Sequence, residues 1–324
     1  MLYKIKKFIP ATLKYNLKKF GRGIISSFIN ILEPITGKFF IFYTRPMYTE
    51  GIPIVSAYPI HDYSEYAIVM QGPIAIKHHF TLETLLLYKK YFPKAFIVLS
   101  TWEGEDMDTV NRARSAGVEV ILNKKPAAGL LNVNLQTASS TAGLKLAAKM
   151  NKKYALKTRT DERIYNSQFL IFLSNLLKNF PITASGFRQK GRIIGIGAYN
   201  YKVKPKMYHV YDNFIFGYTE DVILYFGADL ISNNPPALEF LKDGYPDFPF
   251  TAEGYLFTEY LKKIGHKPEN TPEDYLISLA RHCLLVDARS LGRYWFKYRR
   301  FIDHWGSDNH FSFAEWLDLY NFYR

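Results

Sequence analysis

The sequence predicts an α/β protein with a mostly parallel sheet and helices on both faces. Between residues 65 and 164, short apolar runs alternate with longer amphipathic stretches. Polar or charged residues follow several of these runs, at the points where the strands of such a sheet end and ligands bind. Strands that alternate with helices of this length favour parallel pairing. At 324 residues with 48% hydrophobic content, the chain can bury a large core.

Each predicted element follows from its local pattern. Apolar runs predict buried strands at 65–70, 95–102, 118–122 and 154–164. Helical periodicity predicts helices at about 79–91, 107–116 and 134–150. The carboxyl ends of parallel strands share one edge of the sheet. We therefore expect one crevice there, lined by the strand ends at Gln71, Thr101, Asn123 and Arg159.

The last of these strands contains two adjacent carboxylates, Asp161 and Glu162. A hard divalent cation such as Mg²⁺ or Mn²⁺ takes oxygen ligands and commonly joins a protein carboxylate to substrate phosphates. Asp161 is positioned for that task. The alternative is structural, with both acids capping the following turn and pairing with Arg159 or Arg163.

The chain also carries an ordered series of short blocks. They read IVMQGPI at 68–74, FTLET at 80–84, LSTW at 99–102, NVNLQ at 132–136, STAGL at 140–144, KTRTD at 157–161 and DNFIFG at 212–217. In this order the blocks resemble the WavE family of lipopolysaccharide-synthesis proteins, over roughly residues 65 to 285. The resemblance implies a glycosyltransferase of the A-type fold, with a Rossmann-like sheet, that uses a nucleotide-activated sugar.

This resemblance suggests three parts of the chain. Residues 1–60 form a basic amphipathic N-terminal extension, 61–290 the catalytic domain, and 291–324 an aromatic and basic helical tail. The nucleotide-sugar site is expected at the carboxyl edge of the sheet. Its expected contacts are Gln71, Gly72, Pro73, Ser100, Thr101, Asn134, Gln136, Lys157 and Arg159.

One position departs from the usual sequence motif of A-type glycosyltransferases. A-type glycosyltransferases commonly carry Asp-x-Asp at this strand end, whereas this chain has Arg159, Thr160 and Asp161. Two arrangements therefore stay open. Asp161 holds a divalent cation together with Glu162 or a more distant ligand, or the Arg159 guanidinium neutralises the diphosphate directly through paired hydrogen bonds.

Two carboxylates are candidates for the catalytic base. Asp212 lies between apolar neighbours in a predicted strand at 208–217, and a carboxylate there must find partners or shift its pKa. Glu253 lies in the first turn of a predicted helix at 252–261, and the resemblance slightly favours it as the group facing the acceptor hydroxyl. The structural alternatives are interaction of Glu253 with the helix dipole and a packing role for Asp212.

Charge is concentrated at the amino terminus. The net charge is +13, and residues 1–45 hold nine Lys or Arg against the single acid Glu33. Apolar residues recur there at three- and four-residue intervals, namely Leu2, Ile5, Ile9, Leu13, Leu17, Phe20, Ile24 and Phe28. Such a basic amphipathic segment favours an anionic membrane surface, although packing on the protein's own core is the alternative. Neither a membrane span nor a signal peptide is expected.

Other function classes are disfavoured. The single cysteine, Cys283, excludes an intramolecular disulfide and a cysteine-rich zinc site, which suits a reducing compartment. No nucleic-acid-binding motif accompanies the 25 Tyr and 25 Phe, so nucleic acid is not an expected partner. The glycine-containing stretch 191–197 lacks the Lys-Ser/Thr ending of a P-loop and the third glycine of a dinucleotide-binding motif. We interpret it as a hairpin or loop beside the donor, with Arg188, Lys190 and Arg192 folding over the diphosphate.

These observations predict a cytoplasmic glycosyltransferase, peripheral to the inner face of the cell membrane. It would move a sugar from a nucleotide-sugar donor to a lipopolysaccharide core or a related glycan or glycolipid acceptor. Three alternatives stay open. One is a nucleotidyltransferase that makes the activated sugar, although the glycine-rich basic loop expected after its first strand is missing. Another is a catalytically inactive scaffold in envelope-glycan assembly, for which Arg159 in place of an acid is the argument. The third is a nucleic-acid-binding protein, which salt-sensitive binding to oligonucleotides would distinguish.

Overall fold

A computed structural model describes residues 20, 24, 27–29, 31–37, 45–52, 61–200, 207–231, 251–298, 300–301 and 310–324. The chain forms two compact units, Met1–Pro46 and Met47–Arg324. Residues 291–298 and 310–324 belong to the same unit as the sheet, because their strands and helix pair and pack with it.

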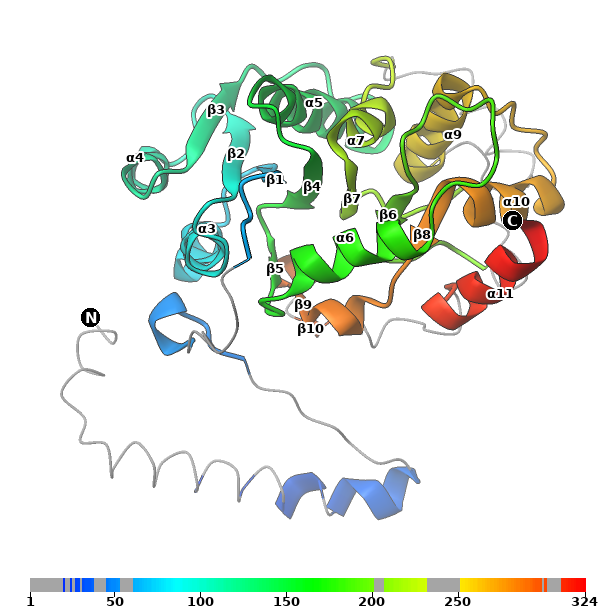
Figure 1. Ribbon diagram of the computed structural model, residues 1–324. Coiled ribbons are helices and arrows are strands. Elements are labelled where there is room, and N and C mark those ends of the chain that lie inside the picture. The colour runs from blue at the N-terminus through cyan, green and yellow to red at the C-terminus, as the bar shows by residue number, and fades with distance from the viewer. Residues whose placement is uncertain are drawn as a thin grey trace. The chain divides into compact units, whose positions relative to one another are not determined.

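A seven-stranded sheet forms the centre of the larger unit (Figure 1), in the order β3-β2-β1-β4-β7-β6-β8. Its strands are β1 Tyr66–Gln71, β2 Phe96–Trp102, β3 Glu119–Asn123, β4 Tyr154–Arg159, β6 Ile193–Gly195, β7 Ile215–Tyr218 and β8 Cys283–Leu285. Strand β7 is antiparallel to both of its neighbours, β4 and β6. All other neighbouring strands in this sheet are parallel. The predicted α/β class with a mostly parallel sheet is confirmed.

Helices cover both faces of this sheet. Among the described residues of the larger unit, the helices are α3 Phe80–Tyr91, α4 Met107–Ser115, α5 Val133–Lys149, α6 Phe169–Asn179, α7 Thr219–Phe226, α9 Ala252–Ile264, α10 Pro272–His282 and α11 Phe313–Tyr323. In Figure 1, α5, α7 and α9 lie above the sheet, and α3 and α6 lie below it. Helix α5 can pack closely on strand β1 because Gly143 has no side chain. A Cβ at Gly143 would lie 2.4 Å from Val69 Cγ1 on that strand.

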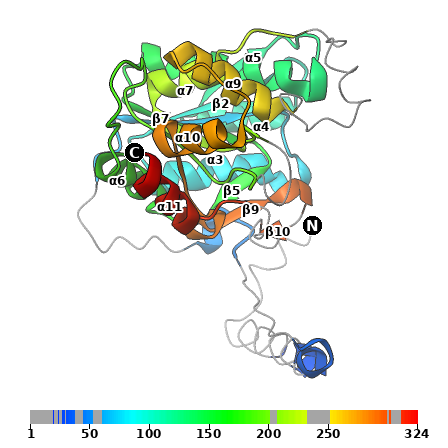
Figure 2. The same ribbon diagram turned by 90° about the vertical axis from the view of Figure 1, so that its right-hand side faces the viewer.

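The predicted strand at 154–164 is two strands in two different sheets. It breaks at Thr160 and Asp161, and β5 Glu162–Ile164 then joins a small sheet with β9 Arg293–Trp295 and β10 Arg300–Phe301. Figure 2 shows β5 and β9 side by side. The break occurs because the Thr160 amide still bonds to Gln71 O, at 3.1 Å, whereas the Asp161 carbonyl accepts from Phe296 N, at 2.9 Å. Asp161 therefore lies between the two sheets, and Glu162 is the first residue of the small one.

The predicted strand at 208–217 is shorter than expected. It begins only at Ile215, and between 208 and 214 the one isolated bridge is that of Val210 with Ala198. The helix expected at 252–261 is confirmed as α9, which begins after Thr251, whose hydroxyl accepts from Gly254 N at 2.8 Å.

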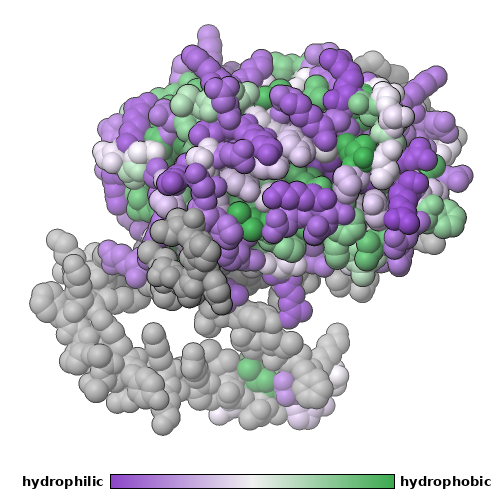
Figure 3. All heavy atoms as spheres, viewed as in Figure 1, coloured by the Kyte–Doolittle hydropathy of each residue, from purple (hydrophilic) through white to green (hydrophobic). Residues whose placement is uncertain are grey.

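In the smaller unit, the described residues at 27–29 and 31–36 are helical. Five large apolar side chains there, spaced three or four residues apart, are more than half exposed: Phe20, Ile24, Phe28, Ile31 and Ile35. On the face of the larger unit seen in Figure 3, apolar residues are scattered among polar ones. None of the helices among the described residues combines the length and the apolar character that crossing a bilayer requires.

Candidate functional site

Four strand ends meet at the carboxyl edge of the sheet, as the sequence predicts. Gln71 at the end of β1 is aligned with Ser100 on β2 and with Arg159 on β4. Strand β7 runs the other way, and its Ile215 is aligned with Lys157. Residues that precede β7 therefore reach the same edge as residues that end β4, which brings Asp212 to this site.

The turn after β1 is fastened to the end of β4. Gly72 has a φ of 117°, a conformation that side chains disfavour, and a Cβ there would lie 3.2 Å from Thr160 Oγ1. Thr160 Oγ1 donates to Pro73 O at 2.5 Å, and its carbonyl accepts from the Thr81 hydroxyl at 2.9 Å. The backbone of Gly72 and Pro73 thus packs against Thr160 at the carboxyl edge of the sheet.

A buried polar network holds the ends of β1, β2 and β3 in place. Ser139 on α5 donates to Gln71 Oε1 at 2.9 Å, and Ser100 Oγ donates to Ser139 O at 2.6 Å. Asn123 then donates to Ser100 Oγ at 2.9 Å. The hydroxyl of Thr101 is enclosed and makes no hydrogen bond with any described residue. Gln71 and Ser100 were expected at the donor site. Their side chains make hydrogen bonds to Ser139 and Asn123, which hold the strands and α5 together.

Arg159 and Asp161 form a two-point ion pair at this edge. Arg159 Nε donates to Asp161 Oδ1 at 2.8 Å, and Nη2 donates to Oδ2 at 3.0 Å. Trp295 on β9 donates its indole N–H to Asp161 Oδ2 at 3.1 Å. Burial acts to raise the pKa of Asp161, but the hydrogen bonds and charge of Arg159 outweigh it and hold this pKa below its usual value. Asp161 is therefore ionised at neutral pH.

These contacts bear on the expected cation. Glu162, the suggested second ligand, turns away and forms a buried ion pair with Arg293, whose Nε lies 3.1 Å from Glu162 Oε2. The described residues include no cluster of three or more His, Cys, Asp or Glu arranged to hold a metal. Asp161 by itself fits a cation of the kind that takes one protein carboxylate with substrate phosphates, provided that Asp161 releases Arg159.

Lys157, Gln136 and Asp212 form a second hydrogen-bonded polar cluster. The Lys157 side chain is fully buried, and Nζ donates to Gln136 Oε1 at 2.9 Å and to Asp212 O at 2.6 Å. Gln136 in turn donates to Asp212 Oδ2 at 2.6 Å. Burial lowers the pKa of Lys157 to about 8, against the opposing attraction of Asp212. Both residues were expected at the donor, whereas their hydrogen bonds here join them to each other and to Asp212.

Asn134, also expected at the donor, ties two loops together. Its Nδ2 donates to Ala127 O at 3.0 Å and to Ile231 O at 2.7 Å, and its Oδ1 accepts from Ile231 N at 2.8 Å. With both amide ends engaged, Asn134 fixes the segment that follows α7 against the start of α5.

Glu253 lies in the first turn of α9, as predicted, and its carboxylate lies 3.9 Å from His209 Nδ1. The same His209 nitrogen lies 2.9 Å from the hydroxyl of Thr251. Burial raises the pKa of Tyr225 well above its usual value, and the charges of Asp212 and Glu253 add to this increase. Both candidate bases therefore act on one buried phenol, which indicates that they border the same region.

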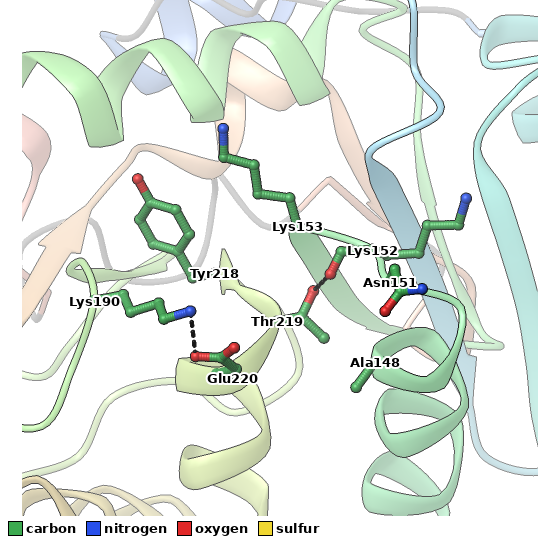
Figure 4. A pocket seen from close by; sticks show the side chains of 8 residues that line it. All are labelled: Ala148, Asn151, Lys152, Lys153, Lys190, Tyr218, Thr219 and Glu220. Carbon is green, nitrogen blue, oxygen red and sulfur yellow. Dashed lines mark hydrogen bonds and ion pairs between the residues drawn. The ribbon is translucent and has the colours of Figure 1, made fainter.

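The loop before β6 lies at the other edge of the sheet. Strand β6 is antiparallel to β7 and thus has the direction of β4, so the residues before it lie at the amino edge. A cavity of about 350 Å³ occurs there (Figure 4), lined by Ala148, Asn151, Lys152, Lys153, Lys190, Tyr218, Thr219 and Glu220. Lys190 Nζ pairs with Glu220 at 2.6 Å, and Arg192 is buried with its guanidinium on Phe180 O and Ala280 O. The structure therefore contradicts the expectation that this loop covers the donor.

Sequence reasoning missed the part played by Trp295. This residue lies 134 positions after Asp161, in the segment expected to be a tail. Its neighbour Arg293 pairs with Glu162 across the small sheet. Strand β9 has only three residues, and its local sequence gives no sign of these contacts. The contact of Trp295 with Asp161 and that of Arg293 with Glu162 both depend on pairing between β5 and β9.

Comparison with solved structures gives only distant likenesses. A mannose-1-phosphate geranyltransferase from Thermus thermophilus has 12% identity and a TM-score of 0.30, with coverage of 59% of this chain and 66% of the other. A core-mannan synthase A from Aspergillus fumigatus, in a Mn/GDP form, has 9% identity and a TM-score of 0.33, covering 69% and 78%. A protein assigned as a glucose-1-phosphate thymidylyltransferase from Bacillus anthracis, in complex with a sucrose, has 9% identity and a TM-score of 0.31, covering 62% and 85%.

These TM-scores are too low to support an argument about the site. No curated protein gives a significant match. The model of one protein family, described as WavE lipopolysaccharide synthesis, matches residues 66–323. That range includes the sheet, both candidate bases, and the β9 residues that contact Asp161 and Glu162. The chain therefore belongs to the WavE lipopolysaccharide synthesis family.

Proposed function

We propose that the protein is a glycosyltransferase of the A-type fold. It moves a sugar from a nucleotide-sugar donor to a lipopolysaccharide core or a related surface-glycan acceptor. Family membership over residues 66–323 is the observation that carries this proposal. The charges at the carboxyl edge support it, because the positive Arg159 interacts there with the carboxylates of Asp161 and Asp212. Such an edge suits a ligand with a diphosphate and a hydroxyl that must lose a proton.

In the proposed reaction, the acceptor oxygen bonds to the anomeric carbon while the bond from that carbon to the diphosphate breaks. The hydroxyl proton passes to a carboxylate, for which Asp212 and Glu253 are the candidates. Arg159 directs positive charge toward the leaving diphosphate. A divalent cation, Mg²⁺ or Mn²⁺, would be held by Asp161 and, when bound, would neutralise further charge on the diphosphate.

The test is turnover of activated sugars. Purified protein is incubated separately with UDP-, GDP-, CMP- and ADP-sugars, with and without Mg²⁺ or Mn²⁺, and release of the nucleotide is measured. Slow hydrolysis of one class, accelerated by a glycan acceptor, is the expected result. A nucleotidyltransferase would instead release pyrophosphate from a nucleoside triphosphate and a sugar phosphate. A scaffold would turn over none of these substrates.

The smaller unit supports a location at the inner face of the cell membrane. Its apolar stripe of Phe20, Ile24, Phe28, Ile31 and Ile35 is exposed, and residues 1–45 have an excess of eight positive charges. Apolar side chains can enter the headgroup region while Lys and Arg attract anionic lipids. We assign this unit the task of keeping a cytoplasmic enzyme close to a lipid-linked acceptor.

A further inference from the structure

The Asp212 carboxylate is buried, and only one of its two oxygens accepts a hydrogen bond from the described residues. Its Oδ2 accepts from Gln136 Nε2 at 2.6 Å, and its backbone oxygen accepts from Lys157 Nζ at 2.6 Å. The other oxygen, Oδ1, accepts no hydrogen bond from any described residue. It is also not among the fully enclosed, unpartnered polar atoms, unlike Oδ1 of the neighbouring Asn213. One oxygen of Asp212 thus keeps its lone pairs available.

Gln136 connects the two restraints. Its Oε1 accepts from Lys157 at 2.9 Å while its Nε2 donates to Asp212, so the lysine fixes which end of the amide faces the carboxylate. Lys157 is itself held in place. Its ammonium donates hydrogen bonds to Gln136 Oε1 and Asp212 O and lies 4.6 Å from the centre of the Phe226 ring. The amide therefore cannot flip without losing both hydrogen bonds.

Several charged side chains lie around this group. Lys157 faces Asp212 most closely, and Arg159, Asp161 and Glu162 also act on Lys157. Arg159 and Asp212 attract each other as well. A buried ammonium without a carboxylate in direct contact needs negative charge nearby, and Asp212 provides it.

We propose that Lys157 and Gln136 are positioning residues that hold Asp212 so that its Oδ1 takes the proton from the acceptor hydroxyl. This inference rests on the proposed glycosyl transfer and selects Asp212 over Glu253 as the base. The acceptor O–H bond breaks, its proton goes to Oδ1, and its electrons form the new bond to the anomeric carbon as the nucleoside diphosphate leaves. In this role Gln136 and Lys157 act on the reaction through Asp212.

The test is a cycle of variants with Gln136→Leu and Asp212→Asn. Gln136→Leu should lower kcat about tenfold to a hundredfold while leaving KM for the donor unchanged, because it removes a hydrogen bond to a charged group. It should also move the acid limb of the kcat profile to higher pH, since that hydrogen bond favours the charged form. In the Asp212→Asn background the same change should have almost no further effect on kcat.

Thr141→Val is the matched control. Thr141 lies on the same helix, α5, and its hydroxyl donates to Phe226 O at 2.8 Å, so its loss removes a scaffold hydrogen bond without touching Asp212. It should lower thermal stability and leave the acid limb in place. Lys157→Met gives a second variant of the positioning pair, and it should reproduce the loss of kcat seen with Gln136→Leu.

Several results would overturn the inference while the proposed function stands. These are a Gln136→Leu enzyme whose only defect is a raised donor KM, an unmoved acid limb, or effects that multiply with those of Asp212→Asn. Wild-type protein that turns over no nucleotide sugar would refute the proposed function instead. In that case the titration of the Asp212 carboxylate can still be followed by NMR, and an identical titration in wild type and Gln136→Leu would also refute the positioning role.

Discussion

Arg159 holds Asp161 through two parallel hydrogen bonds, from Nε to Oδ1 at 2.8 Å and from Nη2 to Oδ2 at 3.0 Å. The acid that the sequence suggests for a cation is therefore paired with the base that replaces the other acid of the usual motif. Donor binding can use this pair in two ways. A cation can replace Arg159 on Asp161, or Arg159 can keep Asp161 and turn its remaining N–H donors toward the diphosphate.

The first prediction distinguishes these two uses. Asp161→Ala should lower donor turnover by about 10²–10³-fold with the fold intact, because charge stabilisation at the diphosphate is lost. Loss of wild-type turnover on addition of a chelator, with recovery on Mn²⁺, would favour the cation. Turnover that is insensitive to the chelator but lost in Arg159→Met would favour the guanidinium. Asp108→Ala, at an exposed pair on α4, is the control, and normal turnover of Asp161→Ala would exclude the role.

The second prediction concerns the base. Asp212→Asn and Glu253→Gln keep the shape of each side chain but remove its proton affinity. The variant that lacks the true base should bind donor normally and lose about 10²–10⁴-fold in turnover. Donor binding is measured by calorimetry and transfer by nucleotide release. If both variants keep nearly normal turnover, the base is a different residue.

The third prediction concerns the buried pair that joins β5 to β9. Arg293→Met leaves the Glu162 carboxylate buried without its partner, which should cost about 3–5 kcal/mol in the free energy of unfolding. Lys262→Met removes the Lys262–Glu259 pair, in which the lysine is exposed, and should cost at most about 1 kcal/mol. Urea unfolding measures both. A loss in Arg293→Met as small as that of the control would show that the pair contributes little.

The fourth prediction uses Asp221, which accepts hydrogen bonds from the backbone amides of Lys190 and Gly191. Burial raises its pKa from 3.8 to about 6, so in this interval the folded state binds more protons than the unfolded state. Its contribution to stability is fully present below pH 3.8 and is lost as the pH rises through about 6.

Asp221→Asn keeps an oxygen acceptor for these amides but has no proton to lose. The free energy of unfolding of the wild type should therefore fall relative to this variant between pH 4 and 6, by about 3 kcal/mol at most. Urea unfolding at a series of pH values checks this. Parallel pH profiles for the two proteins would contradict the assignment.

The fifth prediction concerns the smaller unit. Removal of residues 1–46 should abolish binding to anionic liposomes and slow transfer to a lipid-embedded acceptor, while hydrolysis of soluble donor continues. Each basic residue near such a surface contributes ~1 kcal/mol, and salt should weaken the binding. Liposome flotation at two salt concentrations, with neutral liposomes as the control, measures it. Equal binding by the truncated protein would refute the membrane role.

The sequence by itself determined four neighbouring strands of the seven-stranded sheet and the edge at which they end. Apolar runs and helical periodicity are local patterns, so they predicted β1 to β4, the helices α3 to α5 between them, and the start of α9 near Glu253. They also predicted that Gln71, Ser100 and Arg159 share one edge, because the alternation of strands and helices fixes the direction of parallel strands.

Only the tertiary structure decided which side chains meet at that edge. Lys157 and Gln136 are directed to Asp212 because β7 runs antiparallel to β4, which brings in a residue 55 positions after Lys157. Trp295 reaches Asp161 because β9 pairs with β5, and Lys190 lies at the opposite edge because β6 has the direction of β4. Pairing between distant strands depends on packing of the whole unit, and no local pattern of residues encodes it.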